Sequence, residues 1–374
     1  MAGWVGTLLA TIGRPFQTCI GKLLRKVVCS VAFDERALEV LLKKASALRV
    51  GVIGDFSLDI DWYADMSKSE LPRESPHFTL PIVQERLQPG GAGNVACNFA
   101  ALQPAQVTAL SVLGYDWRST ALIALLAKQK ISTGFLQQTR DRVTNASILP
   151  IRQGPTGMLH EDPRLNFENH EPLGSSWEEV LLDMLEQAAA SFDVLYVCDH
   201  MKYGCITPTI REHLIQLGLE GMTVWVDSKD KCGLYRHVII KPNVMELCAA
   251  MGTPYITRED HLVELALGLQ EVTGSPLVVT RGEKGCLVLE YGEVHRVPAY
   301  PVKLPVYASG AGDTFGVTAA LLHAAGAELR DAAAYAACSS SLVIQKVTGV
   351  VTRMELQKRV AEAQAQAVFP IWYN

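Results

Sequence analysis

The chain has 374 residues, enough for one large domain or two small ones. Hydrophobic residues make up 49% of it and charged residues 20%, which argues against global disorder because a sizeable core can form. The formal net charge of -5 offers no general attraction to nucleic acid, and no apolar run reaches the roughly 18 residues that span a bilayer. The nine cysteines are scattered without a CxxC pair, so we expect reduced thiols in a cytoplasmic protein without a nucleic-acid partner or an integral membrane span.

The first residues differ in charge from the rest of the chain. Residues 1–30 contain no Asp or Glu, and a mostly apolar run, Val5–Ile12, precedes their basic residues, whereas a signal peptide has its basic residues first. The basic residues are Arg14, Lys22, Arg25 and Lys26. We interpret residues 1–36 as an N-terminal extension that is disordered, as chain ends commonly are, or that forms a basic amphipathic segment contacting a membrane or a partner. Residues 367–374 are expected to form a C-terminal tail.

Residues 37–366 have the pattern of one domain with alternating helices and strands. Ala37–Leu48 has the apolar spacing of an amphipathic helix, and Arg49–Gly54 is a buried strand that Asp55 follows. Further apolar runs that precede polar or glycine residues lie at Val107–Leu113, Val194–Val197, Thr223–Val226, Val238–Ile240 and Pro276–Val279. Helical stretches lie at Trp177–Ala190, Arg258–Val272, Thr314–Ala325 and Leu329–Gln345. This alternation predicts an α/β fold with a parallel sheet that is covered by helices on both faces.

Two segments, residues 59–86 and residues 143–171, interrupt the alternation. The first is rich in aromatic residues, prolines and charges, and the second is polar with little helical periodicity. We expect both to form short antiparallel strands that stand off the main sheet. Because α/β proteins bind ligands beyond the carboxyl ends of their parallel strands, a small β lid over that edge would explain these segments.

The strongest local motif is Ser309-Gly310-Ala311-Gly312-Asp313-Thr314-Phe315, which opens an apolar helix. Small residues let the backbone approach a ligand, and the unpaired N–H groups at a helix start suit a phosphate. Asp313 would accept a hydroxyl proton while those N–H groups stabilise charge on a transferring phosphoryl group. A plain helix cap explains the motif equally well when it is taken alone. It is not a Walker A loop, because the Gly-Lys-Ser/Thr ending is absent.

A second glycine motif, Pro89-Gly90-Gly91-Ala92-Gly93-Asn94-Val95-Ala96, joins an extended segment to a helix that runs to about Leu102. Its glycines also allow close approach of a ligand, and the Asn94 amide offers a donor and an acceptor to a hydroxyl. A strand-to-helix turn with an Asn cap is the alternative interpretation.

Together, the two motifs resemble the signatures of the PfkB/ribokinase family of carbohydrate kinases. Gly90–Asn94 is similar to the amino-terminal glycine signature and Gly310–Asp313 to the carboxyl-terminal one, in the same order and at a fitting separation. The resemblance runs from about Arg49 to about Val360, and it implies a ribokinase-like three-layer α/β/α fold with a mainly parallel sheet and a small β lid. Within the family, the kinase domain that acts on heptose 7-phosphate is the most similar, on Gly54-Asp55-Phe56-Ser57-Leu58-Asp59, Trp62, Pro76, Asp199, Lys202, Gly204 and Asp227-Ser228-Lys229.

The resemblance also implies roles for individual residues. Asp313 would be the base, and the backbone of Gly310, Ala311 and Gly312 would form an anion hole for the transferred phosphoryl group. Residues implied to bind the acceptor are Asp55, Asp59, Gly91, Asn94 and Asp199. Residues implied to bind ATP are Lys229, Lys241, Thr280, Arg281, Gly282 and Gly285. Asn243 and Glu246 would organise Mg²⁺ through water, which suits an ion that prefers oxygen ligands.

Several of these residues also fit a purely structural role. Asn243 and Glu246 would also form a helix capping box, and Lys202 and Lys229 would also serve as solvated surface charges. Cys198 and Cys338 are interpreted as small core residues rather than nucleophiles. Tyr307 stands where related kinases that use a monovalent cation have an Asp, so we expect no potassium activation of the usual kind.

The predicted function is transfer of the ATP γ-phosphate, with Mg²⁺, to a hydroxyl of a sugar or sugar phosphate, a heptose phosphate being the first candidate. A phosphorylated acceptor needs cations near the lid, and the candidates are Arg73, Arg86, Arg142, Arg152 and Arg164. A kinase for a plain sugar or nucleoside, such as ribose, fructose or adenosine, is the enzymatic alternative. A non-catalytic sensor that binds a sugar or nucleotide and regulates a partner is the alternative of another class. The resemblance further implies a homodimer formed through paired lids.

Overall fold

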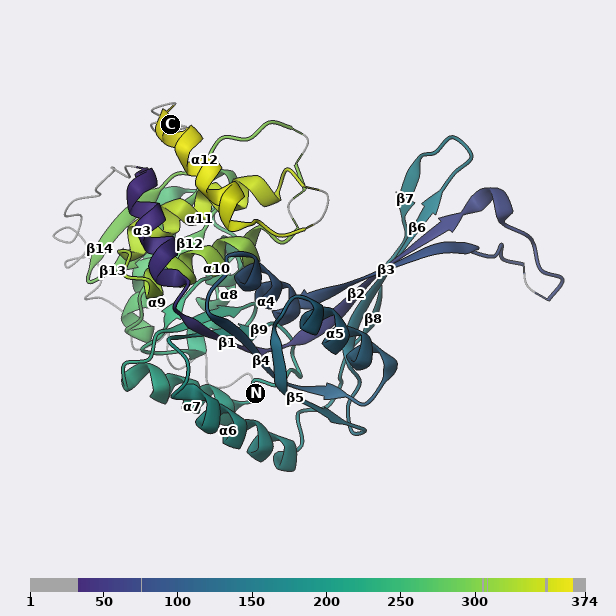
Figure 1. Cartoon of the computed structure of the whole chain (residues 1–374), viewed down its shortest axis with the longest axis horizontal. Helices are drawn as coiled ribbons and strands as arrows, with labels where there is room; N and C mark the ends of the chain where they lie inside the picture. The colour runs from purple at the N-terminus through teal and green to yellow at the C-terminus, as the bar shows by residue number, and fades with distance from the viewer. Residues whose placement is uncertain (1–32, 75, 305, 308, 347–348, 366–374) are drawn as a thin grey trace.

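The computed structural model describes residues 33–365 apart from 75, 305, 308 and 347–348. Most of the predicted extension and the whole predicted tail, 367–374, therefore lie outside the described residues. A nine-stranded sheet forms the centre, and a second sheet projects from it (Figure 1). The order across the main sheet is β14 (Glu293–Val297), β13 (Cys286–Glu290), β12 (Leu277–Thr280), β11 (Ile239–Ile240), β10 (Val224–Ser228), β9 (Val194–Asp199), β1 (Arg49–Gly54), β4 (Gln106–Gly114) and β5 (Ser132–Thr139). Strands β12 through β5 in this order pair in parallel, and the β13–β14 hairpin adds two antiparallel strands.

Both faces of the main sheet are apolar and covered by helices. On β9, Tyr196 belongs to one buried cluster while Leu195 and Val197 belong to the other, as expected from the alternation of side chains along a strand. The first face packs against α3 (Glu35–Ala45), α4 (Ala92–Ala101), α5 (Trp117–Lys128), α10 (Ala311–Ala324), α11 (Leu329–Val343) and α12 (Arg353–Ala365). The second packs against α6 (Ser175–Ala189), α7 (Pro208–Leu219), α8 (Val244–Ala250) and α9 (Glu259–Thr273). The predicted three-layer α/β/α fold is confirmed (Figure 1), and no helix within the described ranges is long and apolar enough to cross a membrane.

Helix α3 begins two residues earlier than the sequence predicted. Asp34 caps it, because Oδ1 of Asp34 accepts the N–H groups of Arg36 at 2.9 Å and Ala37 at 3.2 Å. The side chains of Leu38 and Leu42 on its apolar face are fully buried. The folded domain therefore starts inside the segment 1–36 that was predicted to be an extension.

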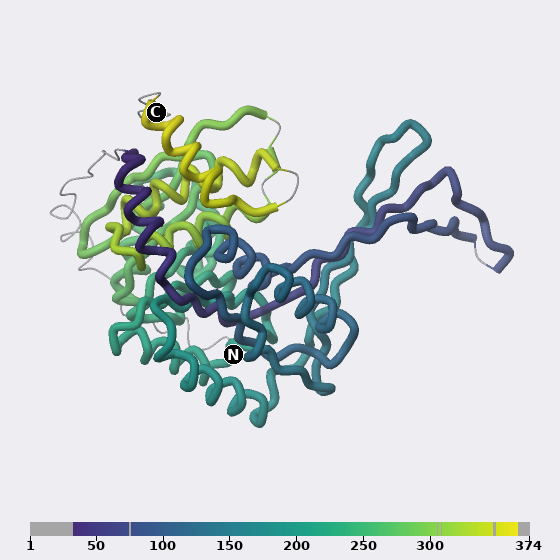
Figure 2. Tube along the Cα trace, in the orientation of Figure 1, coloured from purple at the N-terminus to yellow at the C-terminus, as the bar shows by residue number. Residues whose placement is uncertain are grey.

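The two interrupting segments form most of a second, five-stranded sheet, which we call the lid. Its strand order is β3-β2-β6-β7, with β8 paired to β6. The strands are β2 (Phe56–Asp65), β3 (Ile82–Gly91), β6 (Asn145–Gln153), β7 (Leu159–Glu161) and β8 (Leu165–Phe167). The expectation of short antiparallel strands was wrong in part, because β2 and β3 each have 10 residues and β2 pairs with β6 in parallel. Figures 1 and 2 show the lid strands extending away from the α/β body.

The lid is continuous with the carboxyl edge of the main sheet. Asp55 alone separates β1 from β2, and helix α4 starts at Ala92 directly after β3 ends at Gly91. Phe56 pairs with Gly91, and the Ala92 N–H donates to the Asp55 carbonyl at 3.0 Å. Both ends of the β2–β3 hairpin therefore lie at the strand edge where α/β proteins place their ligand sites.

Candidate active site

The carboxyl-terminal glycine motif forms the start of α10. Gly310 precedes the helix in the left-handed conformation, with φ of 76°, which glycine adopts without strain. The N–H groups of Ala311 and Gly312 lie in the first turn, where a helix has no internal acceptor for them, and they point out of its positive end. This helix start is therefore suited to bind an anion, and Asp313 lies within the same turn.

A hydrogen bond joins the two glycine motifs. Asn94 Nδ2, in the first turn of α4, donates to Asp313 Oδ2 at 2.6 Å across a separation of 219 residues. Asn98 holds this pair in place, because its Nδ2 donates to the Asn94 carbonyl at 2.9 Å and its Oδ1 accepts the Thr314 hydroxyl at 2.9 Å. The motifs that resemble the two signatures thus meet at one carboxylate, whose orientation is fixed by an amide.

Charged groups surround Asp313 on the α10 face of the sheet. Lys241 Nζ lies 2.9 Å from Asp227 Oδ2, and His200 Nε2 lies 3.8 Å from Asp227 Oδ1. Burial and the Asp227 carboxylate raise the pKa of Asp313, while His200, Asn94 and Lys241 lower it. Burial disfavours the charged form of Asp227, but Lys241 and His200 together hold its pKa well below the usual range. The pKa of Asp313 is therefore raised above its usual value, beside an Asp227 carboxylate that stays ionised.

Lys241 lies directly beneath the first turns of α10. A Cβ atom added at Gly316 would lie 3.0 Å from Lys241 Cε and 2.0 Å from the Tyr196 hydroxyl, and one added at Gly312 would lie 3.8 Å from Lys241 Nζ. The glycines let the helix rest on this buried ammonium. The positive end of α10 and the Lys241 charge therefore act on the same small volume beside Asp313.

Three of the predicted acceptor residues lie near Asp313 or where the lid meets the main sheet. Asp59 projects from β2, and its pKa is raised to about 6, mainly by burial, with Arg164 lowering it and the charges of Asp61 and Asp313 raising it. A Cβ atom at Gly91, where φ is 52°, would lie 2.4 Å from the Asp55 carbonyl oxygen, so a side chain there would force the lid away from the sheet. Asp59 and Asn94 thus lie near Asp313, while Gly91 lies where the lid meets the main sheet.

The other two predicted acceptor residues have their oxygens occupied. The Asp55 carboxylate accepts backbone N–H groups from His200 at 2.9 Å, Met201 at 2.7 Å and Cys205 at 2.9 Å, so it fixes loop 200–205. Asp199 is paired with Lys231 at 2.6 Å and accepts the Tyr235 hydroxyl at 2.9 Å. Its side chain is fully buried on the face opposite to Asp313, so the acceptor role of Asp199 stays a prediction that this placement does not support.

Among the predicted nucleotide residues, Thr280, Gly282 and Gly285 lie in a loop beside Asn243, whereas the side chains of Arg281 and Lys229 are directed elsewhere. The Thr280 N–H donates to the Pro242 carbonyl at 2.9 Å and Thr280 forms a bridge with Asn243, so the loop 280–285 lies beside the end of β11. Gly282 and Gly285 both have positive φ in this turn. Arg281 is instead directed toward α9, where it pairs with Glu259 at 2.7 Å. Lys229 is exposed, whereas the half-buried Lys231, which the sequence analysis did not identify, pairs with the buried Asp199.

Asn243 and Glu246, the predicted magnesium residues, form a capping box at the start of α8. The Asn243 N–H donates to Glu246 Oε2 at 2.8 Å, and the Glu246 N–H donates to Asn243 Oδ1 at 2.9 Å. Burial raises the pKa of Glu246, Lys241 lowers it and Asp227 raises it, so the Glu246 carboxylate interacts electrostatically with the charged groups beside Asp313. In the described part of the chain, no three His, Cys, Asp or Glu side chains cluster as a complete metal shell. This donor set fits Mg²⁺, which binds through one or two carboxylates and keeps several waters.

Two functional candidates were missing from the sequence analysis. His200 follows Asp199 on the loop that Asp55 fixes, and its side chain faces Asp227. Lys231 closes that loop from below by donating to the Met201 carbonyl at 2.9 Å. Neither residue belongs to a glycine motif, and the only signal was their nearness in sequence to the aspartates at the ends of β9 and β10.

Comparison with known proteins places this site in a family. Residues 49–353 match the pfkB family carbohydrate kinase profile. Bifunctional protein HldE of Trichlorobacter lovleyi is 31% identical over 330 residues, and its namesake in Escherichia coli O9:H4 is 30% identical over 336 residues. Each alignment covers 86% of this chain but only 65% of the relative, so the chain spans slightly less than two thirds of these curated relatives.

Solved structures agree on the fold. Arabidopsis thaliana ribokinase, complexed with ribose and ATP, superposes with a TM-score of 0.62 at 18% identity, covering 84% of this chain and 99% of that one. Phosphofructokinase-2 of Escherichia coli, in complex with fructose-6-phosphate, superposes with a TM-score of 0.64 at 20% identity over the same shares. With the two glycine motifs joined at Asp313 and the family profile matched over most of the chain, the protein belongs to the pfkB family of carbohydrate kinases.

Proposed function

We propose that this kinase transfers the γ-phosphate of ATP, with Mg²⁺, to a hydroxyl of a sugar phosphate, and that the first candidate acceptor is heptose 7-phosphate. The single observation that carries the proposal is the Asn94–Asp313 hydrogen bond beneath the open start of α10. It sets a partly exposed carboxylate beside unpaired backbone N–H groups, which is the arrangement that proton removal and phosphoryl transfer require together. The resemblance of Gly54–Asp59 and its surroundings to heptose 7-phosphate kinase domains supports the choice of acceptor.

In this reaction Asp313 accepts the proton of the acceptor hydroxyl. The N–H groups of Ala311 and Gly312 stabilise negative charge on the transferring phosphoryl group, and Lys241 adds a positive charge from below. Asn243 and Glu246 would hold Mg²⁺ through water, and the ion would neutralise charge on the ATP phosphates. Thr280 with Gly282 and Gly285 lies beside Asn243, which is where the nucleotide would bind.

A phosphorylated acceptor requires cations on its side of the site. The charge of Arg164 lowers the pKa of both Asp59 and Asp61, so this arginine lies near the lid carboxylates that face Asp313. Arg86 lies opposite Asp61 across β2 and β3. Arg152 is already neutralised by Asp162 at 2.6 Å, which makes it a poor candidate. The lid therefore supplies cations close to the acceptor space, as the proposal demands.

A panel of sugars, sugar phosphates and nucleosides with ATP and Mg²⁺ tests the proposal. We expect the highest kcat/KM for a heptose phosphate, and Asp313→Asn should lower kcat by at least about a thousandfold with little change in ATP binding. Faster turnover of ribose, fructose or adenosine would replace the proposed acceptor while keeping the kinase. Near-normal turnover by Asp313→Asn would contradict the assigned base.

Three further expectations belong to the same proposal. Tyr307 is 43% exposed and carries no carboxylate, so added K⁺ should leave the rate unchanged. The lid exposes apolar side chains, including Phe78, Ile82 and Val83, which supports the expected homodimer and can be tested by light scattering. The cytoplasmic location also stays a prediction, which fractionation of the producing cells would test.

A further inference from the structure

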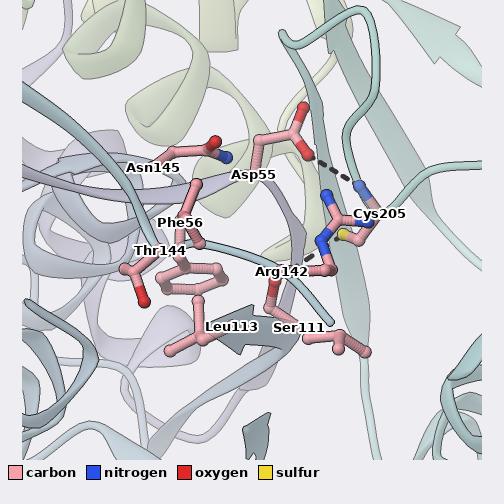
Figure 3. Close-up of a pocket in the computed structure, with 10 residues that line it drawn as sticks. Asp55, Phe56, Ser111, Leu113, Arg142, Thr144, Asn145 and Cys205 are labelled. Atoms are coloured by element: carbon pink, nitrogen blue, oxygen red, sulfur yellow. Dashed lines mark hydrogen bonds between the residues drawn. The ribbon is translucent and has the colours of Figure 1, made fainter. Parts of the chain in front are cut away.

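A small cavity lies at the carboxyl edge of the main sheet, between the lid and the ends of β1 and β4. Asp55, Ser111, Arg142, Asn145 and Cys205 are among the residues that line it, and Figure 3 shows the Arg142 guanidinium among Asp55, Ser111 and Cys205. The cavity has a volume of about 10 Å³ and holds one water-sized group. The cavity is lined mainly by polar atoms and is partly open to solvent.

Arg142 has unused hydrogen-bond donors in this cavity. Its Nη2 donates to the Tyr203 carbonyl at 2.7 Å. Its Nε and Nη1 atoms are buried and have no hydrogen-bond partner among the described residues. Burying charged donors without acceptors is costly, so the side chain needs an acceptor that the protein itself does not supply.

Arg142 also differs from the other arginines that have an unpartnered buried nitrogen. Each of the others has a carboxylate within ion-pair distance, and they are Arg118, Arg211, Arg281 and Arg359. Within the described residues, no carboxylate lies within that distance of Arg142. The cavity thus holds a cation that the surrounding protein does not neutralise.

The nearest acidic groups do not compensate for the Arg142 charge. Burial raises the pKa of the Cys205 thiol to about 12, so the thiol stays neutral. The Asp55 carboxylate is occupied by the N–H groups of loop 200–205, and burial raises its pKa. Because a guanidinium is permanently charged and presents its donors as a rigid fork, the remaining partner should be an oxyanion.

We propose that Arg142 and this cavity form the subsite for one anionic oxygen of the acceptor's phosphate group. The assignment rests on the proposed sugar phosphate acceptor and names the residue that recognises its charged end. Only one oxygen enters, because the cavity holds one water-sized group, and the rest of the phosphate stays on the lid side. Asp55 lines the subsite, and its carbonyl also accepts the N–H of Ala92, which opens the helix whose Asn94 binds Asp313. The acceptor would therefore lie across Asp55, with its phosphate at Arg142 and its reacting hydroxyl at Asp313.

The test measures steady-state kinetics of Arg142→Gln with the preferred sugar phosphate and with the corresponding unphosphorylated sugar. We expect KM for the sugar phosphate to rise on the order of 100-fold, because one partner of a buried charge-assisted contact is lost. KM for ATP and kcat/KM for the unphosphorylated sugar should change much less than KM for the sugar phosphate. Inorganic phosphate should compete with the acceptor in the wild-type enzyme and lose that competition in the variant. Arg152→Gln is the matched control, because its guanidinium, also on the lid side, already pairs with Asp162, and it should change none of these values.

The outcomes separate this subsite from the proposed function. If sugar phosphates are substrates but Arg142→Gln keeps their KM within about threefold, the cavity binds an ordered water or an adventitious ion only, and the subsite is overturned. If only unphosphorylated sugars are substrates, the proposed acceptor and the subsite assigned to its phosphate both fail. Should Arg142→Gln not fold, Arg142→Lys keeps the charge without the fork and should raise the sugar phosphate KM about tenfold. An unchanged KM in that folded variant would equally overturn the subsite.

Discussion

Asp199 ends β9, and Asp227 lies one residue before the end of the neighbouring β10, but their carboxylates have different surroundings. The strands β9 and β10 pair so that Cys198 lies opposite Asp227 and Asp199 opposite Ser228. This offset of one residue sends the two carboxylates to opposite faces of the sheet. Asp199 is enclosed by Lys231, Arg211 and Tyr235 on the face of α7, whereas Asp227 faces Lys241, His200 and Asp313 beneath α10.

The comparison shows that the face of the sheet on which an acidic side chain lies decides which groups surround it. Both aspartates are buried and both are paired with a lysine. One pair fixes the loop 200–205 from below, and the other adjusts the charge around the candidate base. Four substitutions test whether this division between a structural pair and a catalytic pair is real.

The largest effect is expected for Lys241→Met. It removes the buried partner of Asp227 and the cation under α10, so the uncompensated carboxylate should cost about 3–5 kcal/mol in the free energy of unfolding. The kcat of the folded variant should fall by roughly a thousandfold, because charge on the phosphoryl group loses its buried counter-charge. Denaturant titration and initial rates measure the two effects. A stable variant with normal kcat would show that the Lys241–Asp227 pair has no catalytic role.

Lys231→Met should have a comparable effect on stability and a much smaller effect on chemistry. Lys231 pairs with Asp199 at 2.6 Å, yet Arg211 and the Tyr235 hydroxyl remain beside that carboxylate, so we expect a loss of about 2–3 kcal/mol. Turnover in the folded variant should stay within about tenfold of wild type, measured under conditions where both proteins are folded. If kcat fell as far as in Lys241→Met, the two pairs would have the same role and the comparison would fail.

His200→Gln should change the pH dependence more than the maximal rate. Burial alone lowers the pKa of His200, but the Asp227, Asp313 and Asp55 carboxylates raise it above the usual value. The protonated ring lowers the pKa of Asp313, so its loss should move the acidic limb of kcat/KM to higher pH. His323→Gln is the matched control. His323 lies near the far end of α10, the helix that carries Asp313, so this variant should leave the acidic limb of kcat/KM in place.

The same histidine makes a second, signed prediction for stability. A group whose pKa is raised on folding stabilises the fold fully below its unfolded pKa, and that contribution disappears as pH rises through the folded pKa. His200→Gln should therefore reduce the free energy of unfolding more at pH 6 than at pH 9. An equal loss at both values would show that the ring contributes only packing.

The smallest effect is expected for Lys229→Ala. Lys229 is exposed at the end of β10, so its removal should change the free energy of unfolding by less than about 0.5 kcal/mol. KM for ATP should also stay within about twofold, which steady-state titration of ATP measures. A large rise in KM for ATP would support the nucleotide-binding role that the sequence analysis assigned to Lys229.

The sequence was sufficient for the parts that depend on local pattern. Apolar runs closed by polar residues located β1, β4, β9, β10, β11 and β12, and small residues before apolar helices marked the starts of α4 and α10. Cys198 and Cys338 are buried, as their interpretation as core residues required. The β13–β14 hairpin was not predicted, although a two-residue turn with positive φ at both residues, Tyr291-Gly292, separates its strands.

Strand pairing and side-chain direction could not be predicted from the sequence. Asp199 was assigned to the acceptor because nothing in its own strand shows on which face it lies once β10 is beside it. Arg281 lies in the expected loop, but a long side chain takes the nearest carboxylate, and Glu259 is supplied by a helix that starts 22 residues earlier. The roles of Arg142 and Lys231 depend on carbonyl groups of loop 200–205, whose path no local pattern predicts.

The single-residue connection between β1 and β2 has a mechanical consequence. The main sheet and the lid meet at Asp55, and the chain returns from the lid through Gly91 into the helix that carries Asn94. The lid is therefore joined to the main sheet through backbone that belongs to the active site. A movement of the lid strands would turn the peptide groups next to Asp55 and Asn94, and so would change the orientation of Asp313 directly.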